Sequence, residues 1–305
     1  MSLALIFPGQ GAQEPGMGQG IFDRGSPAHD LAVEASEITG LDVVRLACEG
    51  AADEVVATEV AQPLLLLHSI ALLRELPATT AAAVSGFAGH SLGEYSALVA
   101  SGSLEWQDAL RLVRERGLAM ASASTPAQGM TAVLALSAEQ VQEVIGATPG
   151  EGVAVVANLN APGQVVISGD RARLDALVEP LRAAGARRAM ALAVGGAFHS
   201  PLMAAAAARL GAAIDAAPLV TGRPQAFNVD GALHTAPGEI AAALRAQLTG
   251  AVRWIECVTS LAGLGADRFL ELGPGTTLAA LGRRIAPELA WVSASTPAAA
   301  AEAAA

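Results

Sequence analysis

The segment Gly89-His90-Ser91-Leu92-Gly93 follows an apolar run and precedes a stretch with helical character, Glu94 to Val99. It reads Gly-x-Ser-x-Gly, the pattern of a nucleophile elbow, in which a strand ends, the chain turns sharply and a helix begins beneath the serine. Ser91 would then lie over a helix N-terminus, whose free amide groups favour the negative charge that develops when a serine attacks a carbonyl group. The pattern is weak by itself in a chain with 32 glycines, so its meaning depends on the rest of the sequence.

Composition favours a soluble globular protein. The chain has 305 residues, enough for about two domains with a large core. Its mean hydropathy of +0.45 is high, but no uncharged apolar run reaches the roughly 18 residues that a membrane span requires. Met1–Gly9 has no basic region before its apolar residues, which favours a first buried strand over a signal peptide. We therefore expect a cytoplasmic protein with no membrane partner.

Charge and cysteine content limit the classes of partner. The net charge of −11 argues against nucleic acid as the main partner. Cys48 and Cys257 are too few for a disulfide framework and lack metal-ligand spacing. We therefore expect reduced cysteines and no metal site.

The chain before residue 127 and after residue 195 reads as alternating strands and helices. Leu3–Phe7 and Val84–Gly89 are short apolar strands, and Trp106–Ala121 is an amphipathic helix. Pro63 is suited to the first position of a strongly apolar, buried helix. After residue 195 we expect helices 201–216, 237–248 and 254–264 and strands 225–228 and 268–271. The alanine-rich tail Pro297–Ala305 is expected to fray.

Between about residues 127 and 195 the order of elements becomes β-α-β-β-α-β. The expected elements are strand 129–136, helix 137–145, strand 153–157, strand 164–168, helix 172–184 and strand 188–194. Ser137 is suited to cap the first of these helices. This order is that of the ferredoxin-like split unit, and it predicts an inserted subdomain.

A serine hydroxyl needs a base within hydrogen-bond reach, and four of the five histidines are expected to lie or point away from Ser91. His29 and His234 lie in polar, loop-like surroundings and are expected at the surface. His68 lies in the apolar helix and is expected in the core. His90 adjoins Ser91 on a tight turn and should point away from it.

His199 is the favoured base. It lies in a loop of small residues, Val194 to Pro201, directly after the proposed insertion, where the chain would return to the main sheet. The alternative is an ordinary loop histidine. An elbow serine upstream favours the catalytic interpretation.

Seven motifs occur in a fixed order, and together they resemble a known family. They are Gly9-Gln10-Gly11-Ala12-Gln13, Gln62-Pro63, Gly89 to Ala97, Arg116-Gly117, Asn158 to Gln164, Ala197-Phe198-His199-Ser200 and Glu271 to Gly275. The series resembles the malonyl-CoA:acyl carrier protein transacylases of type II fatty acid synthesis and the related polyketide synthase acyltransferases. The resemblance extends from about residue 3 to residue 295.

The resemblance implies an α/β fold with a hydrolase-like core. A large α/β catalytic domain with a mainly parallel sheet would comprise residues 1–126 and 196–305, and residues 127–195 would form the ferredoxin-like subdomain. The active site would lie in the cleft between them. The protein is expected to be a monomer.

The resemblance also implies a ping-pong transfer of a malonyl group through a malonyl-serine ester. Ser91 would attack malonyl-CoA, and His199 would take its proton and later activate the incoming thiol. The backbone amides of Gln10 and Leu92 would form the oxyanion hole. Arg116 would pair with the free malonyl carboxylate. Spacing alone does not distinguish it from its neighbours Arg111 and Arg114, and the Arg-Gly motif selects it.

Three further residues are assigned to the substrate pocket by the resemblance. Gln62 would lie buried and support the polar network of the site. Asn160 would face the cleft from the small subdomain, although it is almost as well explained as a turn residue before Pro162. Phe198 precedes the base, where phenylalanine accompanies malonyl selection and serine accompanies methylmalonyl selection in polyketide acyltransferases. Its ring would crowd a methyl group on the α-carbon.

The sequence departs from the family pattern beside the base. No Asp or Glu is placed to complete a triad, and in the family backbone carbonyl groups orient the histidine instead. One such carbonyl belongs to a segment usually written Gln-Leu-x-Asn-Pro-Val-Arg-Trp. Here Gly250 and Ala251 replace the usual Asn and Pro. The carbonyl of Gly250 can keep this role, in a loop that we expect to be looser.

The implied partners are malonyl-CoA and the phosphopantetheine thiol of a holo acyl carrier protein, with no bound cofactor. Carrier proteins of this kind are acidic, so docking on this acidic chain should need a basic patch. Candidates are Arg283 and Arg284, or Arg187 and Arg188. Two other activities remain open. A serine thioesterase or hydrolase would share the elbow and the base, and a discrete trans-acting polyketide acyltransferase would use another carrier protein.

Overall fold

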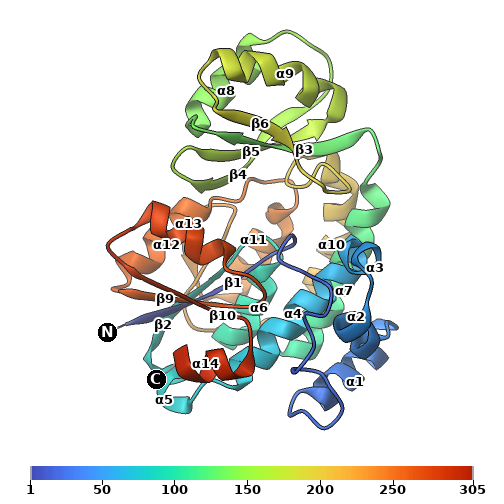
Figure 1. Ribbon diagram of the computed structural model, residues 1–305, viewed down its shortest axis with the longest axis vertical. Helices are drawn as coiled ribbons and strands as arrows, with labels where there is room; N and C mark the ends of the chain where they lie inside the picture. Colours follow the sequence, from blue (N-terminus) through green and yellow to red (C-terminus); the bar gives the residue numbers. More distant parts are fainter. Residues whose placement is uncertain (1, 304–305) are drawn as a thin grey trace.

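The computed structural model describes residues 2–303, and Figure 1 shows two layered parts, one above the other. The lower part is built on a six-stranded sheet with strand order β10-β9-β1-β2-β7-β8. Every neighbouring pair is parallel except β7 and β8. The strands are β1 (Leu3–Phe7), β2 (Val84–Gly89), β7 (Gln225–Ala226), β8 (Leu233–His234), β9 (Arg268–Leu272) and β10 (Ala290–Ala294).

Helices cover both faces of this sheet. The helices of the lower part are α1 (His29–Thr39), α2 (Val43–Glu49), α3 (Ala52–Val56), α4 (Thr58–Arg74), α5 (Ala78–Ala83), α6 (Gly93–Ser101), α7 (Trp106–Ala123), α10 (Ala204–Ala216), α11 (Pro237–Gln247), α12 (Trp254–Gly263), α13 (Thr277–Ile285) and α14 (Pro297–Ala303), with a short 3₁₀ turn at Pro201–Met203. Leu5 and Phe7 pack in the core that includes α4, α6 and α7, and Ile6 packs on the other face with α12 and α13. A strand buried on both faces reads as a continuous apolar run, which is why β1 has no alternation.

The upper part is a four-stranded antiparallel sheet with order β4-β5-β3-β6. Its elements are β3 (Gln128–Leu134), α8 (Ala138–Ala147), β4 (Ala154–Ala161), β5 (Gln164–Asp170), α9 (Arg171–Ala183) and β6 (Arg188–Ala191). Their order confirms the predicted β-α-β-β-α-β unit. Ser137 caps α8 as expected, because its hydroxyl accepts the amide of Gln140 at 3.3 Å. The predicted fold class is confirmed, while the domain limits at residues 126 and 196 stay a prediction.

The structure corrects the predicted start of the apolar helix. α4 begins at Thr58, so Pro63 lies inside it. A proline there cannot donate a hydrogen bond to the carbonyl group four residues earlier. That carbonyl belongs to Glu59, and it accepts a hydrogen bond from Arg114 Nη1 at 2.8 Å instead. A long-range contact from α7 therefore satisfies the carbonyl that Pro63 leaves free, and the helix continues through it.

The expectation that the tail frays is wrong for residues 297–303. They form α14, whose first turn is capped by the Thr296 hydroxyl, which accepts the amide of Ala299 at 3.2 Å. Ala300 is fully buried in the core. The remainder of the predicted tail, residues 304 and 305, lies outside the described residues.

Close packing at the end of β1 sets the position of α6. A Cβ atom at Gly93 would lie 2.1 Å from the carbonyl oxygen of Phe7, and one at Gly89 would lie 1.8 Å from the backbone of Gly93. Such approaches leave no room for a side chain at either position. The two elbow glycines therefore hold strand, turn and helix against one another.

We predict that Gly93→Ala lowers the free energy of unfolding by about 3 kcal/mol, since an extra methyl group in a packed contact forces the backbone apart. Gly238→Ala is the matched control, because it lies in α11 with nothing near the added atom. Urea unfolding of both variants measures the effect. Equal stability of the two variants would contradict this account of the elbow.

Candidate active site

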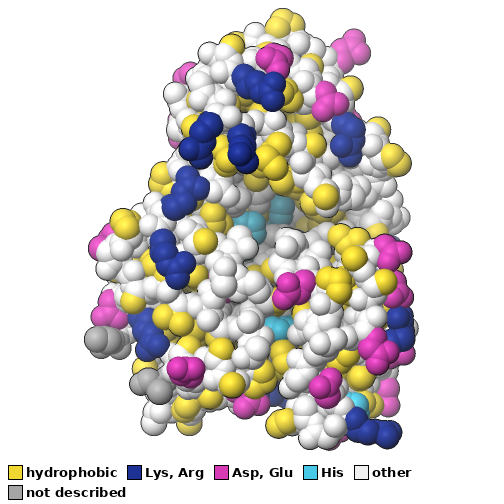
Figure 2. All heavy atoms as spheres, viewed as in Figure 1, with side chains coloured by type: hydrophobic (Ala, Val, Ile, Leu, Met, Phe, Trp, Pro, Cys, Tyr) yellow, Lys and Arg dark blue, Asp and Glu magenta, His cyan; other side chains and the backbone are white. Residues whose placement is uncertain are grey.

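The site lies at the bottom of a hollow between the two parts, where histidine side chains are visible from outside (Figure 2). Ser91 connects β2 to α6 with a φ of 51°, a left-handed conformation that a non-glycine residue adopts only when its surroundings hold it there. The amide of Ser91 donates to Asn228 Oδ1 at 2.6 Å. The elbow geometry predicted from the sequence is therefore present.

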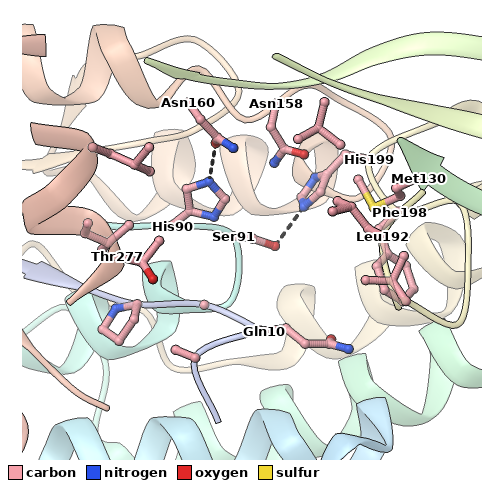
Figure 3. A pocket seen from close by; sticks show the side chains of 18 of the residues that line it. Gln10, His90, Ser91, Met130, Asn158, Asn160, Leu192, Phe198, His199 and Thr277 are labelled. Atoms are coloured by element: carbon pink, nitrogen blue, oxygen red, sulfur yellow. Dashed lines mark hydrogen bonds between the residues drawn. The ribbon is translucent and has the colours of Figure 1, made fainter. Parts of the chain in front are cut away.

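His199 lies directly against this serine. Ser91 Oγ and His199 Nε2 are 2.7 Å apart, and Figure 3 shows the two side chains pointing toward each other. His199 Nδ1 lies 3.0 Å from the carbonyl oxygen of Gln247 and 3.2 Å from that of Gly250. Because a carbonyl group only accepts, Nδ1 carries the proton, and Nε2 is left free to accept the serine proton.

His199 is neutral and strongly shielded from water. Burial, and to a smaller extent the positive charge of Arg116, lower the pKa of His199 to about 3. The hydrogen-bond partners of Nδ1 are the two carbonyl groups, which fix the orientation of the ring. The replacement of Asn-Pro by Gly250-Ala251 therefore leaves the Gly250 contact in place. The contact from Gln247 was not predicted, although the sequence motif contains this residue.

Of three neighbouring arginines, Arg116 is the one that reaches the serine. Its side chain is buried, and Nη2 donates to Ser91 Oγ at 2.9 Å. Its Nη1 donates to Gln62 Oε1 at 2.8 Å, and Nη2 also donates to Gln247 Oε1 at 3.0 Å. Burial lowers the pKa of the guanidinium. Two glutamine side chains thus hold a cation beside the nucleophile.

The other two arginines of α7 point elsewhere. Arg111 pairs with Asp108 on the surface, and Arg114 donates to the carbonyl groups of Thr39 and Glu59. The structure thus separates three residues that spacing alone did not distinguish.

The predicted oxyanion residues flank Ser91. Gln10 lies on the loop after β1 and reaches the cavity beside Ser91 (Figure 3), and Leu92 opens the first turn of α6. Within residues 2–303 neither amide donates a hydrogen bond to another group. The side chain of Gln10 is held by a hydrogen bond to Thr58 Oγ1 at 3.1 Å. Free amide groups at a helix N-terminus can bind a developing oxyanion.

A cavity of about 240 Å³ opens above the serine. Both parts of the molecule line it, and its apolar wall comprises Met120, Met130, Val166, Leu192, Val194 and Phe198. On the polar side Asn160 Oδ1 lies 2.8 Å from His90 Nε2 (Figure 3). Asn160 therefore faces the cavity from β4, and the ring of His90 contacts Asn160 instead of Ser91.

The remaining histidines do not contribute to the site. His68 is buried in α4, where burial lowers its pKa to about 4. His29 and His234 are half-buried and contact the Phe22 carbonyl and the Asp230 carboxylate, so the prediction that both lie at the surface is only partly right.

Two other polar residues beneath the elbow were not predicted. Asn228 accepts the Ser91 amide and donates from Nδ2 to the carbonyl of Gly89 at 2.8 Å. Glu94 is buried in the first turn of α6, where burial raises its pKa, while the hydrogen bonds from Asn228 and Gln247 and the charge of Arg116 oppose this rise. Asn228 follows a two-residue strand and lies in none of the motifs, so nothing in the sequence indicated its contacts. Glu94 lies within the motif Gly89 to Ala97, and that position was the one indication of its importance.

Across residues 2–303, no group of three or more His, Cys, Asp or Glu side chains is arranged to hold a metal ion. The helices in this range include none with the length and apolar character needed to cross a bilayer.

Comparison with known proteins agrees with this geometry. The family model for the acyl transferase domain matches residues 4–298. The chain belongs to the acyl transferase domain family. A malonyl CoA-acyl carrier protein transacylase of Bacillus subtilis is 39% identical over 97% of this chain and 94% of that protein. One from Staphylococcus aureus is 37% identical over 92% of each.

Solved structures give the same relationship. The malonyl-CoA:acyl carrier protein transacylase of Xanthomonas oryzae superposes on this acyl transferase with a TM-score of 0.93 at 39% identity, covering 99% and 98% of the two chains. A type II polyketide synthase acyl-carrier protein has been solved with its malonyl-transacylase. The chain of that structure that matches has a TM-score of 0.92 at 33% sequence identity, and the match covers 98% of this chain and 98% of that chain.

We predict that the reactivity of Ser91 toward a sulfonyl fluoride stays nearly constant between about pH 5 and about pH 6.5. With its pKa lowered to about 3, His199 stays unprotonated throughout this range. If the pKa of the histidine were the usual value of about 6.5, the reaction would instead be more than about tenfold slower at pH 5 than at pH 6.5. Intact-protein mass follows the labelling, with Ser91→Ala as the unlabelled control. An apparent pKa near the usual value would refute the shielding of His199.

Proposed function

We propose that this acyl transferase moves a malonyl group from malonyl-CoA to the phosphopantetheine thiol of an acyl carrier protein, through a malonyl ester on Ser91, in fatty acid biosynthesis. The observation that carries the proposal is the buried guanidinium of Arg116, 2.9 Å from Ser91 Oγ. A simple serine hydrolase has no need for a cation there. An acyl group that ends in a carboxylate does need one.

In the first half-reaction Ser91 Oγ attacks the thioester carbonyl of malonyl-CoA while His199 Nε2 takes its proton. The carbonyl oxygen becomes an oxyanion, which the amides of Gln10 and Leu92 stabilise. The tetrahedral intermediate then expels coenzyme A as the thiol, using the proton that His199 holds. In the second half the thiol of the carrier protein gives its proton to His199 and attacks the ester carbonyl. The bond to Ser91 Oγ then breaks, His199 returns the proton to that oxygen, and the malonyl group leaves as a thioester of the carrier protein.

Arg116 recognises the malonyl carboxylate, and binding of that carboxylate strengthens His199 as a base. Its Nη2 faces Ser91 Oγ in the free protein, and a carboxylate offers a better acceptor for this donor than a hydroxyl group. Because the charge of Arg116 contributes to the low pKa of His199, a bound carboxylate offsets that charge. The pKa of His199 then rises when the correct substrate is present.

The pocket side chains account for the choice of acyl group. Phe198 lines the cavity next to the base, and its ring leaves little space for a substituent on the α-carbon. Malonyl is therefore preferred over methylmalonyl, within the few kcal/mol of discrimination that a steric pocket supplies. Gln62 serves by holding Arg116.

The proposed route needs no cofactor besides its two substrates, the malonyl-CoA thioester and the carrier-protein thiol, since the nucleophile and the base are both protein groups. We also assign the protein to the cytoplasm on the basis of its composition. A polyketide carrier protein is the second candidate acceptor, because one of the structural relatives was solved with such a partner.

We predict that Arg116→Ala lowers kcat/KM for malonyl transfer by at least roughly 100-fold, since two charge-assisted hydrogen bonds are each worth about 1.5–3 kcal/mol. Steady-state transfer to a holo acyl carrier protein measures the loss. Arg111→Ala on the same helix is the matched control, because its side chain is exposed and pairs with Asp108 on the surface. A similar rate in the Arg116 and Arg111 variants would exclude the assigned role.

We also propose that Arg283 and Arg284 help to dock the carrier protein. Both are exposed in the last turn of α13. Arg284 donates to the carbonyl of Pro162 at 2.7 Å and to the side chain of Gln164, which itself lines the active-site cavity. Arg187 lies beside Arg284 around a neighbouring depression. Figure 2 shows basic side chains along this edge of the hollow.

Replacing both Arg283 and Arg284 by Ala should raise the KM for the carrier protein by about tenfold, since exposed charge pairs contribute up to about 1 kcal/mol each. The KM for malonyl-CoA should stay unchanged. Steady-state kinetics with each substrate varied in turn separates the two effects. Equal changes in both KM values would argue against docking at this surface.

A further inference from the structure

Glu94 is a buried carboxylate to which the mechanism above assigns no role. It lies in the first turn of α6, three residues after the nucleophile. Its Oε1 accepts a hydrogen bond from the backbone amide of Asn228, and its Oε2 accepts one from Gln247 Nε2 at 2.5 Å. Burying a carboxylate is costly unless its oxygens are well bonded. Glu94 therefore needs both of these donors.

The two residues that Glu94 holds are those that hold the active site. Asn228 accepts the amide of Ser91 and bonds the carbonyl of Gly89. The side chain of Gln247 donates to the carbonyl of Ser91 at 2.8 Å and accepts from Arg116 Nη2 at 3.0 Å, and its backbone carbonyl lies 3.0 Å from His199 Nδ1. Through Asn228 and Gln247, the carboxyl group of Glu94 is thus connected to the turn at Ser91, to Arg116 and to His199.

The chemistry of these contacts fixes which way the Gln247 side chain points. Its amide lies between acceptors on one side, the Glu94 carboxyl oxygen and the carbonyl of Ser91, and on the other side a guanidinium, which only donates hydrogen bonds. One orientation satisfies both neighbours, with the NH₂ group toward Glu94 and the oxygen toward Arg116. The reverse orientation would bring the NH₂ group against the guanidinium and leave Arg116 without this acceptor.

We propose that Glu94 is the positioning residue for recognition of the acyl carboxylate, because it sets the Gln247 amide so that its oxygen holds Arg116 beside Ser91. The proposal rests on the function proposed above. Glu94 touches neither the substrate nor the reacting atoms.

Glu94→Gln tests this assignment. The variant keeps the size of the side chain but presents an amide, so a donor can face the Gln247 NH₂ group and favour the reversed orientation. Acetyl-CoA, whose acyl group has no carboxylate, reports on the serine and the base without Arg116. We expect the ratio of kcat/KM for malonyl-CoA to that for acetyl-CoA to fall about tenfold or more, the effect of one lost charge-assisted hydrogen bond.

Glu271→Gln is the matched control. Glu271 is also a fully buried carboxylate, and it accepts the amides of Leu278 and Ala279 at 3.0 and 2.9 Å without contacting Ser91, Arg116 or His199. It is expected to lose stability but to keep the wild-type ratio of the two substrates. If Glu94→Gln does not fold, Glu94→Asp decides, because it keeps the carboxyl group but withdraws it from Gln247. The ratio should fall in this variant as well.

The outcomes separate the two proposals. A folded Glu94 variant that slows both substrates equally, or that keeps the wild-type ratio, overturns the positioning role. A wild-type protein that transfers no malonyl group overturns the proposed function itself. In an Arg116→Ala background the substitution at Glu94 should no longer change the ratio, and a persistent change would show that Glu94 acts by another route.

Discussion

The site depends on a left-handed turn at Ser91, which close backbone packing and a long-range hydrogen bond both hold. Gly93 lies directly under the carbonyl of Phe7, and no side chain fits between them. The Ser91 amide is bonded to Asn228, a residue that arrives from β7, far along the chain. The parallel sheet brings the ends of β1, β2 and β7 to one edge, so Ser91, the Gln10 loop and Asn228, which bonds the Ser91 amide, meet there. The packing of Gly93, the contact with Asn228 and the position of Ser91 all depend on this turn.

The charged groups around Ser91 determine the chemical properties of the site. Burial, and to a smaller extent the neighbouring guanidinium of Arg116, make His199 a weak base in the free protein. Many catalytic histidines are oriented by a carboxylate, whereas two backbone carbonyls orient the ring of His199. The buried carboxylate of Glu94 instead reaches Arg116 through Gln247. Because Gln247 lies between Glu94 and Arg116, the guanidinium is not paired directly with Glu94. In the proposed function it stays available for the carboxylate of an acyl group.

The sequence predicted local features well, because each has a local cause. The elbow glycines, the Ser137 cap and the order of elements in the small subdomain depend on neighbouring residues and were all found as expected. The start of α4 was missed because it depends on Arg114, about fifty residues from Pro63 along the chain. Asn228 was missed for the same reason, since its contacts with Ser91 and Gly89 join segments far apart in the chain. The strands β10 and β8 were not predicted either, because β10 forms by pairing with β9 and β8 by pairing with β7.

The most direct test of the account is intact-protein mass after brief mixing with malonyl-CoA, followed by addition of a holo acyl carrier protein. The account predicts a malonyl adduct on the wild-type protein that is absent from Ser91→Ala and that passes to the carrier protein. An adduct that decays to free malonate at the same rate with and without the carrier protein would contradict it and identify a hydrolase instead.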